Sequence, residues 1–171
     1  MAASTPERDA SIEIRREEIG SPSAQALIRD LNGELRERYP EPGANHFRLD
    51  ADEVAQGRGA FLVAYRGDDP VACGAIRLEG SHTAEIKRMY VVPDARGRGI
   101  SRLLLAALEA EGRKLGARRL VLETGERQTE ALALYERTGF VRIPRFGEYV
   151  SSPLSVCMAK ELPGFTSSQP S

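Results

Sequence analysis

The chain has 171 residues, a length that fits one domain, since domains commonly take about 100–200 residues. Hydrophobic residues make up 41% and charged residues 29%, a composition that excludes an intrinsically disordered chain. Lys and Arg total 24 against 25 Asp and Glu, and this net charge of -1 argues against generic nucleic-acid binding, which needs a basic face.

Cysteine usage and the chain ends indicate a soluble protein of a reducing cytoplasm. Cys73 and Cys157 each lie in an apolar stretch, so neither a disulfide framework nor a C-x-x-C metal-ligand pair is expected. Residues 1–10 lack the apolar run of a secretory signal, and no apolar run is long enough for a transmembrane helix. We therefore expect one domain at 11–162 between flexible tails at 1–10 and 163–171, with no membrane partner and no metal.

The first half of the chain combines strands and helices. Alternating apolar residues predict a strand at 11–17. Ser21 is a suitable N-cap and Pro22 suits the first helical position, so a helix is predicted from there to about Arg38. The other elements expected before the glycine-rich segment are an irregular stretch at 39–51, a short helix at 52–56, a hairpin of strands 61–66 and 71–79 around turn residues 67–70, and a strand at 84–92.

The second half alternates helices with strands. A long amphipathic helix is predicted at 100–115, with Gly116 in the position that ends helices. It is followed by a strand at 119–123, a helix at 128–137, and strands at 140–143 and 155–162. This mixed order predicts an α/β fold whose sheet is partly antiparallel and carries helices on its faces.

The junction between the strand at 84–92 and the next helix is the segment that suggests chemistry. Gly97 and Gly99 lead directly into a helix N-terminus, where unpaired backbone N–H groups and the helix dipole favour a phosphate group. Arg96, Arg98 and Arg102 add positive charge around it. A plain strand-to-helix turn with solvated arginines remains an alternative, because Gly-x-Gly alone is a weak signal.

Two common phosphate motifs are excluded. The segment contains no Gly-Lys-Ser/Thr, so it is not a P-loop. The Rossmann fingerprint also fails, because Arg102 stands where its third glycine belongs and the segment follows a late strand.

The pattern from about residue 11 to residue 162 resembles the GNAT superfamily of acyl-CoA-dependent N-acyltransferases. The resemblance rests on the family's Arg/Gln-x-x-Gly-x-Gly/Ala motif, on the Val-x-Pro before it, and on a downstream Ala-x-x-Leu-Tyr-x-x-x-Gly-Phe. The matching residues are Arg96, Gly99, Ser101, Val91, Pro93, Ala131, Leu134, Tyr135, Gly139 and Phe140. It implies a single-domain fold with a mixed, mostly antiparallel sheet, a splayed parallel strand pair and helices on both faces.

The resemblance also implies a site for acetyl-CoA as cosubstrate. The backbone amides of residues 96–102 would hold the diphosphate, and residues 89–92 would bind the pantetheine arm in the gap between the strands at 84–92 and 119–123. A backbone N–H near Val91 would stabilise the oxyanion. Gln128 replaces the family's usual Asn by a longer amide, which leaves that contact in doubt. The implied cofactor residues are Met89, Tyr90, Val91, Val92, Arg96, Gly97, Arg98, Gly99, Ile100, Ser101, Arg102 and Gln128.

Two residues are candidates for proton transfer. Tyr135 stands where the family keeps a tyrosine that protonates the leaving thiolate, and its alternative role is that of a core tyrosine. Glu85 stands where several members carry a glutamate general base. The alternative for Glu85 is a structural ion pair with Lys87, on the same strand face, or with an arginine.

Other polar residues are assigned weaker roles. His46 and His82 are expected to be surface histidines, although the resemblance implies that the His46 loop borders the acceptor pocket. Tyr149 is expected either to line that pocket or merely to pack.

The implied activity is transfer of an acetyl group from acetyl-CoA to a primary amine of a small molecule by direct attack. The alternatives are a protein lysine or N-terminal acetyltransferase, and a non-catalytic acyl-CoA-binding regulatory module. The chain is expected to be a monomer or a homodimer. The predicted pocket loops weakly favour a cationic amine, because they carry Glu41, Asp50, Asp52, Glu53 and Glu148 against Arg48 and Arg145.

Overall fold

Seven strands form one sheet in the computed structural model, which describes residues 11–163. The predicted tails at 1–10 and 163–171 lie outside the described residues, except for Pro163. The order across the sheet is β1-β2-β3-β4-β5-β7-β6, and every neighbouring pair is antiparallel except β4 with β5. The strands are β1 (Ile12–Arg16), β2 (Gly59–Arg66), β3 (Asp69–Leu78), β4 (Thr83–Val91), β5 (Arg119–Gly125), β6 (Val141–Ile143) and β7 (Ser155–Glu161).

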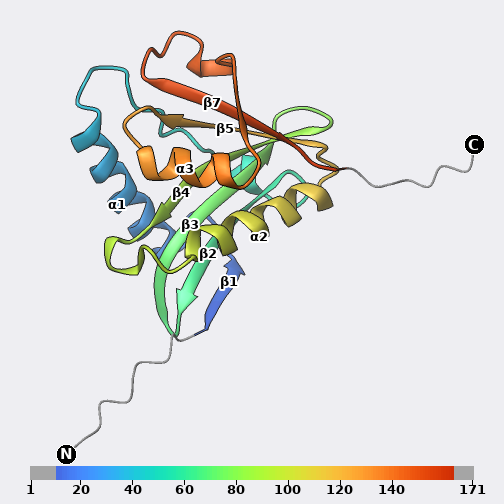
Figure 1. The fold of residues 1–171 in the computed structure, drawn as a ribbon. Helices are drawn as coiled ribbons and strands as arrows, with labels where there is room; N and C mark the ends of the chain where they lie inside the picture. The colour runs from blue at the N-terminus through green and yellow to red at the C-terminus, as the bar shows by residue number, and fades with distance from the viewer. Residues whose placement is uncertain (1–10, 164–171) are drawn as a thin grey trace, which may run out of the picture.

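Helices cover both faces of this sheet, as the sequence predicts (Figure 1). Helix α1 (Pro22–Arg38) packs on one face, where Leu27 and Leu31 are buried with Phe61 of β2. Helices α2 (Ile100–Lys114) and α3 (Thr129–Arg137) contribute to the hydrophobic cluster of the other face. Short 3-10 helices lie at Ala51–Val54, Pro93–Ala95 and Gly147–Tyr149. None of the helices within residues 11–163 is long and apolar enough to cross a membrane.

Local chemistry explains where several elements begin and end. Ser21 Oγ accepts a hydrogen bond of 3.1 Å from Ala24 N, which confirms the predicted cap of α1. The predicted turn between β2 and β3 is too long, because Asp69 and Pro70 already belong to β3. The register shifts beside Pro70, and an irregular position of this kind tolerates a residue that has no N–H to donate.

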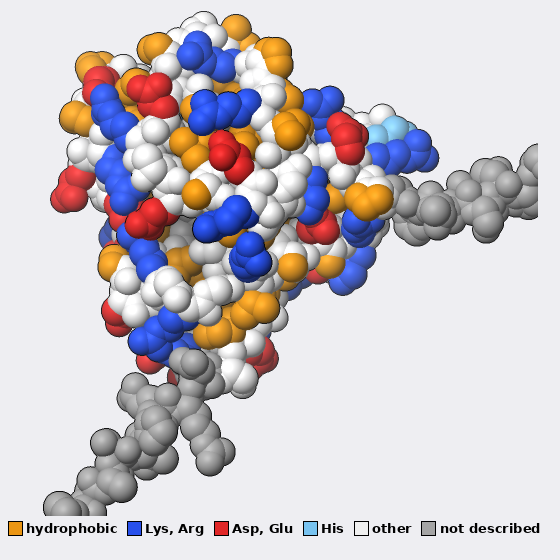
Figure 2. Space-filling view, viewed as in Figure 1, with side chains coloured by type: hydrophobic (Ala, Val, Ile, Leu, Met, Phe, Trp, Pro, Cys, Tyr) orange, Lys and Arg blue, Asp and Glu red, His pale blue; other side chains and the backbone are white. Residues whose placement is uncertain are grey.

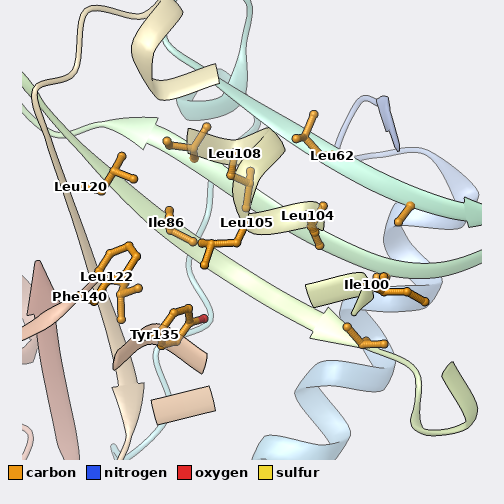
Figure 3. Close-up of a cluster of buried hydrophobic side chains, with 14 of the residues drawn as sticks. Leu62, Ile86, Ile100, Leu104, Leu105, Leu108, Leu120, Leu122, Tyr135 and Phe140 are labelled. Carbon is orange, nitrogen blue, oxygen red and sulfur yellow. The ribbon is translucent and has the colours of Figure 1, made fainter. Parts of the chain in front are cut away.

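The cluster beneath α2 fixes the start of that helix relative to β4. Figure 3 shows leucines of α2 lying over Ile86 of β4 and Leu120 of β5. Leu104 and Leu108 are fully buried, and burying each such side chain stabilises the fold by about 2 kcal/mol. This packing places the N-terminus of α2 beside the end of β4.

The two parallel strands separate along their length. Register pairs run only from Thr83 opposite Arg119 to Ile86 opposite Leu122. Beyond that point β4 continues along β3, and β5 continues along β7 as far as Gly125. Figure 1 shows the carboxyl halves of β4 and β5 diverging beside α1 and α3, so the predicted splayed pair is confirmed.

A β-bulge lies in β4 where the strands diverge. Cys73 pairs with Tyr90 and Ala75 pairs with Lys87, so β4 holds one residue more than β3 over this stretch. Arg88 has a φ of 60°, and the thiol of Cys73 donates to its carbonyl oxygen at 3.4 Å. The bulge breaks the alternation of side chains in the strand.

Candidate functional site

Two cavities meet in the gap between β4 and β5. The larger, of about 380 Å³, lies at the N-terminus of α2, and the smaller, of about 110 Å³, lies deeper between the strands. Leu31, Met89, Gln128, Ala131 and Tyr135 line both cavities. The two cavities are therefore direct neighbours that share one wall.

The larger cavity brings together most of the residues predicted to bind the cofactor. They are Met89, Tyr90, Val91, Arg96, Gly97, Gly99, Ser101, Arg102 and Gln128. Val92, Arg98 and Ile100 do not line it, and the side chain of Ile100 belongs to the hydrophobic cluster under α2.

The backbone at the start of α2 suits an anion. Gly99 is the N-cap residue with a φ of 79°, a left-handed conformation that side-chain-bearing residues rarely adopt. The space where its Cβ would stand is open to 4 Å. A ligand can therefore approach the N–H groups of the first helical turn closely, with the positive end of the helix dipole behind them.

The charges around this cavity are mixed, with an excess of arginine. Its lining contains four arginines (Arg38, Arg96, Arg102 and Arg137) and two glutamates (Glu34 and Glu130). Arg96 donates to both carboxylate oxygens of Glu34, at 2.9 and 3.1 Å, and to Val91 O at 2.8 Å. Arg96 thus links α1 to the end of β4 and is not a solvated arginine, which is the alternative that the sequence leaves open. Figure 2 shows basic and acidic side chains interspersed over the face that carries the helices.

Gln128 stabilises the turn between β5 and α3. Its Oε1 accepts hydrogen bonds from Gly125 N at 2.9 Å and from Thr124 Oγ1 at 3.3 Å. The side-chain amide therefore supports the local turn through its oxygen and leaves its NH₂ group as the part that can donate to a ligand.

The end of β5 is tied to the end of α1 by close packing. A Cβ at Gly125 would lie 1.9 Å from Tyr39 Oη, so the tyrosine packs here only because position 125 has no side chain. Tyr39 Oη accepts a 2.9 Å hydrogen bond from Arg127 N, and Arg127 pairs with Glu41 at 2.5 Å. These contacts fix the wall of the smaller cavity.

Glu85 is buried behind the smaller cavity and does not line it. The side chain is 1% exposed, and its Oε1 accepts from Arg77 Nη2 at 2.7 Å and from Arg77 Nε at 3.1 Å. Tyr149 Oη donates to Glu85 Oε2 at 2.7 Å. Both carboxylate oxygens are therefore occupied, a geometry that supports the ion-pair alternative for Glu85 over the role of a general base.

Glu123 is the acidic side chain that lines the smaller cavity, and the sequence analysis does not include it among the candidate catalytic residues. It ends an apolar run on β5, and this position of a carboxylate in a buried strand is the signal that could have revealed it. Burial raises the pKa of Glu123 to about 7, whereas a hydrogen bond from Ser155 acts in the opposite direction. A carboxylate with this pKa can accept a proton near neutral pH.

A chain of polar side chains leads from Glu123 to the cavity mouth. Ser155 Oγ and Ser152 Oγ lie within hydrogen-bond distance of each other, at 2.9 Å. His46 Nε2 lies 3.2 Å from the same Ser152 Oγ. Each of these side chains can both donate and accept, so the chain can reverse its direction of donation.

His46 is not the surface residue that the sequence suggests. Its side chain is 17% exposed, lines the smaller cavity and packs edge-on against Tyr149 at 5.0 Å between ring centroids. Tyr149 is buried and lines the same cavity. His82, by contrast, is exposed, as predicted.

Tyr135 lies at the junction of the two cavities. Its ring packs edge-on against Phe140 at 5.6 Å between centroids. Figure 3 shows the hydroxyl oxygen on the side of the ring away from Phe140. Burial, together with the nearby Glu123 carboxylate, raises the pKa of Tyr135 above its usual value. The phenol is therefore protonated at neutral pH and can act as a donor.

Neither cysteine is suited to act as a nucleophile at this site. Both are buried, and neither lines the two joined cavities. Burial raises the pKa of Cys73 to about 12 and also raises that of Cys157, so both remain thiols near neutral pH.

Comparison with known sequences identifies the family of the chain. A family model described as the acetyltransferase (GNAT) family matches residues 24–140. The IAA acetyltransferase of Azospirillum brasilense is 41% identical over 154 residues, which cover 89% of this chain and 99% of that protein. The mycothiol acetyltransferase of Geodermatophilus obscurus is 33% identical over 135 residues, which cover 69% of this chain and 41% of that protein.

Solved structures agree with this result. A crystal structure from Klebsiella pneumoniae, provisionally assigned as an acyl-CoA N-acyltransferase, is 33% identical with a TM-score of 0.76 and covers 90% of this chain and 99% of its own. A GNAT family acetyltransferase from Elizabethkingia anophelis with acetyl-CoA bound shares the fold, at 20% identity and a TM-score of 0.62 over 88% of this chain and 98% of its own. The chain therefore belongs to the GNAT acetyltransferase family and is an N-acetyltransferase of the GNAT type.

Proposed function

We propose that the protein transfers the acetyl group of acetyl-CoA to a primary amine of a small molecule by direct attack. The observation that carries this proposal is the meeting of the two cavities at Tyr135, with Glu123 on the wall of the smaller one. A donor in the larger cavity and an acceptor in the smaller one would react at this junction.

The larger cavity fits the cosubstrate. The N–H groups at the start of α2, approached over Gly97 and Gly99, would bind the diphosphate, and Arg102 would add charge. The diverging end of β4 would bind the pantetheine arm through its backbone. Acetyl-CoA supplies the activated acetyl thioester.

Glu123 takes the proton from the attacking amine in this proposal. Its pKa of about 7 lets the carboxylate be ionised at neutral pH and still accept a proton in the transition state. The proton then leaves through Ser155 and Ser152 to His46, as each hydrogen bond in the chain reverses. Glu85, which is held by Arg77 and Tyr149, would keep the cavity wall in place.

Tyr135 donates its proton to the sulfur as the carbon–sulfur bond breaks and the amide bond forms, and the tyrosinate then regains a proton from solvent. The products are the N-acetylated amine and free coenzyme A, so no covalent enzyme intermediate is needed. Exclusion of water between the strands strengthens this hydrogen bond in the transition state.

The size of the smaller cavity supports a small acceptor. Its volume of about 110 Å³ is well below the range of about 300–1,000 Å³ that is common for drug-sized ligands. Ala44, His46 and Leu154 also line a third cavity toward the surface, which provides an entrance. A protein lysine acetyltransferase would need an open groove for a peptide.

The test is release of free thiol from acetyl-CoA with a panel of small amines and of lysine-containing peptides, with acetylated products identified by mass spectrometry. Thiol release with a small amine, reduced in Tyr135→Phe, is the expected result. Efficient acetylation of peptides alone would contradict the small-molecule acceptor. Binding of acetyl-CoA without thiol release from any amine would indicate the regulatory module.

A further inference from the structure

A buried guanidinium lines the smaller cavity without a carboxylate partner. Arg88 is 8% exposed, and its Nη2 donates to Asn32 Oδ1. Its guanidinium carbon lies 5.2 Å from the centre of the Phe47 ring. Among residues 11–163, no Asp or Glu forms an ion pair with Arg88. Within the described residues, the side chains that the guanidinium contacts, Asn32 and Phe47, are both uncharged.

This arrangement is unfavourable for the protein alone. A buried charge loses its hydration, and burial accordingly lowers the pKa of Arg88. The Asn32 amide satisfies one of five guanidinium donors and supplies no negative charge. The residue also occupies a left-handed backbone conformation at the bulge, with a φ of 60°. Such a combination is typical of a side chain whose partner is a ligand.

Lys87 brings a second cation to the same cavity because the bulge interrupts the alternation of β4. Its Nζ donates to Arg48 O at 3.0 Å and lies 3.9 Å from Glu148 Oε1. Glu148 is 44% exposed, so its screening by water weakens this pair. The charged groups that line the smaller cavity are thus Lys87, Arg88, Glu123 and, when protonated, His46.

Of the five acidic residues in the pocket loops, only Glu148 faces cations of the smaller cavity, lying 3.9 Å from Lys87 Nζ and 3.6 Å from His46 Nδ1. Four of them pair with arginines outside the smaller cavity: Glu41 with Arg127, Asp50 with Arg48, Asp52 with Arg58, and Glu53 with Arg77. The loop composition, which weakly favours a cationic acceptor, is therefore a poor guide to the cavity itself.

We propose that Arg88, assisted by Lys87, binds a carboxylate of the acceptor, and that the acceptor is a small amino acid-type molecule carrying both an amine and a carboxylate. This inference rests on the proposed acetyl transfer to a small amine. Arg88 on β4 and Glu123 on β5 line one cavity of about 110 Å³. A carboxylate held by two guanidinium N–H groups would leave the amine of a compact molecule toward Glu123 and Tyr135.

The experiment compares matched acceptors that differ only in this charge. Thiol release from acetyl-CoA is measured with free L-amino acids and with their carboxamides, which keep the amine and lose the carboxylate. The wild-type kcat/KM should be about 10- to 100-fold higher for the acid of an accepted pair, the range expected for hydrogen bonds to a charged group. Equal or better use of carboxamides would overturn the inference while leaving acetyl transfer intact. Absence of thiol release with every amine would instead contradict the proposed function.

Variants of Arg88 test whether this side chain causes the preference for the amino acid over its carboxamide. Arg88→Gln should remove the preference for the acid and leave acetyl-CoA affinity unchanged, whereas Arg88→Lys should retain part of it. Arg36→Gln is the matched control, because Arg36 is exposed, stacks on the same Phe47 ring at 5.2 Å, and lines neither of the joined cavities. This control should keep the wild-type preference.

A binding measurement makes the test independent of turnover and of folding losses. Calorimetry with the coenzyme A complex should show tighter binding of an N-acetyl amino acid than of its amide for wild type, and equal binding for a folded Arg88→Gln. If Arg88→Gln does not fold, Arg88→Lys supplies the comparison. An acid preference that is unchanged in the folded Arg88 variant would overturn the assignment.

Discussion

The phenol of Tyr149 donates a 2.7 Å hydrogen bond to Oε2 of the buried Glu85. Arg77 occupies the other oxygen of the same carboxylate, at 2.7 Å. This relationship links the 3-10 helix at Gly147–Tyr149 to strands β3 and β4. The burial of Glu85 is therefore explained by its contacts with Arg77 and Tyr149, without any role in proton transfer.

Glu85→Gln should therefore lower stability more than it alters catalysis. It removes the charge that Arg77 and Tyr149 bind, and the loss of hydrogen bonds to a charged group costs about 2 kcal/mol. Urea unfolding should show this loss, and Tyr149→Phe should show a smaller one. Unchanged stability of Glu85→Gln together with a large fall in kcat would instead support Glu85 as the base.

Glu123→Gln should change how stability depends on pH. Burial raises the folded-state pKa of Glu123 from 4.5 to about 7, so the folded state binds this proton more tightly than the unfolded state does. The stabilisation of the folded state that comes from this tighter proton binding is fully present below pH 4.5. It is lost as pH rises through about 7.

The difference of about 2.5 pKa units corresponds to about 3 kcal/mol. Relative to wild type, Glu123→Gln should therefore gain stability in urea unfolding between pH 4.5 and pH 8. A difference between the two proteins that does not vary with pH would show that the carboxylate titrates as it does in water.

Tyr135→Phe should lower kcat by about 100-fold, because it removes a donor that stabilises the leaving sulfur. The ring, its packing on Phe140 and the helix are kept. Melting temperature and acetyl-CoA affinity should therefore be nearly unchanged. A variant that loses stability but keeps kcat would show that Tyr135 is only a core residue.

Gly99→Val should weaken acetyl-CoA binding at least about tenfold, equivalent to about 1.4 kcal/mol. Valine would be strained at a φ of 79° and would cover the N–H groups at the start of α2. Gly20→Val is the control, since Gly20 also faces open space but lacks a positive φ. Equal dissociation constants for the two variants in calorimetry would remove the proposed diphosphate site.

The order of elements was predictable because it depends on local patterns. Alternation and helical spacing follow from the chain itself, as does the cap formed by Ser21. The glycine-rich start of α2 was predictable for the same reason, since Gly99 meets a backbone requirement at its own position. The 3-10 helices at Pro93–Ala95 and Gly147–Tyr149 were not predicted, because such short turns carry no periodicity.

The arrangement of side chains in the site depends on contacts between residues that are distant in sequence. Such contacts could not be predicted from local sequence patterns. Glu85 meets Tyr149, and Arg96 meets Glu34, only through the tertiary fold. Arg88 faces the cavity because a bulge in β4 breaks the alternation of side chains, and no residue pattern marks that bulge. The motif marks Tyr135 in the sequence, whereas only the cavity formed by the folded chain marks Glu123.

The pH dependence of kcat tests the central claim, that Glu123 is the base facing Tyr135, most directly. At saturating acetyl-CoA and amine, wild-type kcat should rise about tenfold per pH unit and level off near pH 7, where Glu123 is ionised. Glu123→Gln should lose at least about 100-fold and show no such inflection, and Glu85→Gln should keep the wild-type profile. An inflection that persists in Glu123→Gln and disappears in Glu85→Gln would contradict the account.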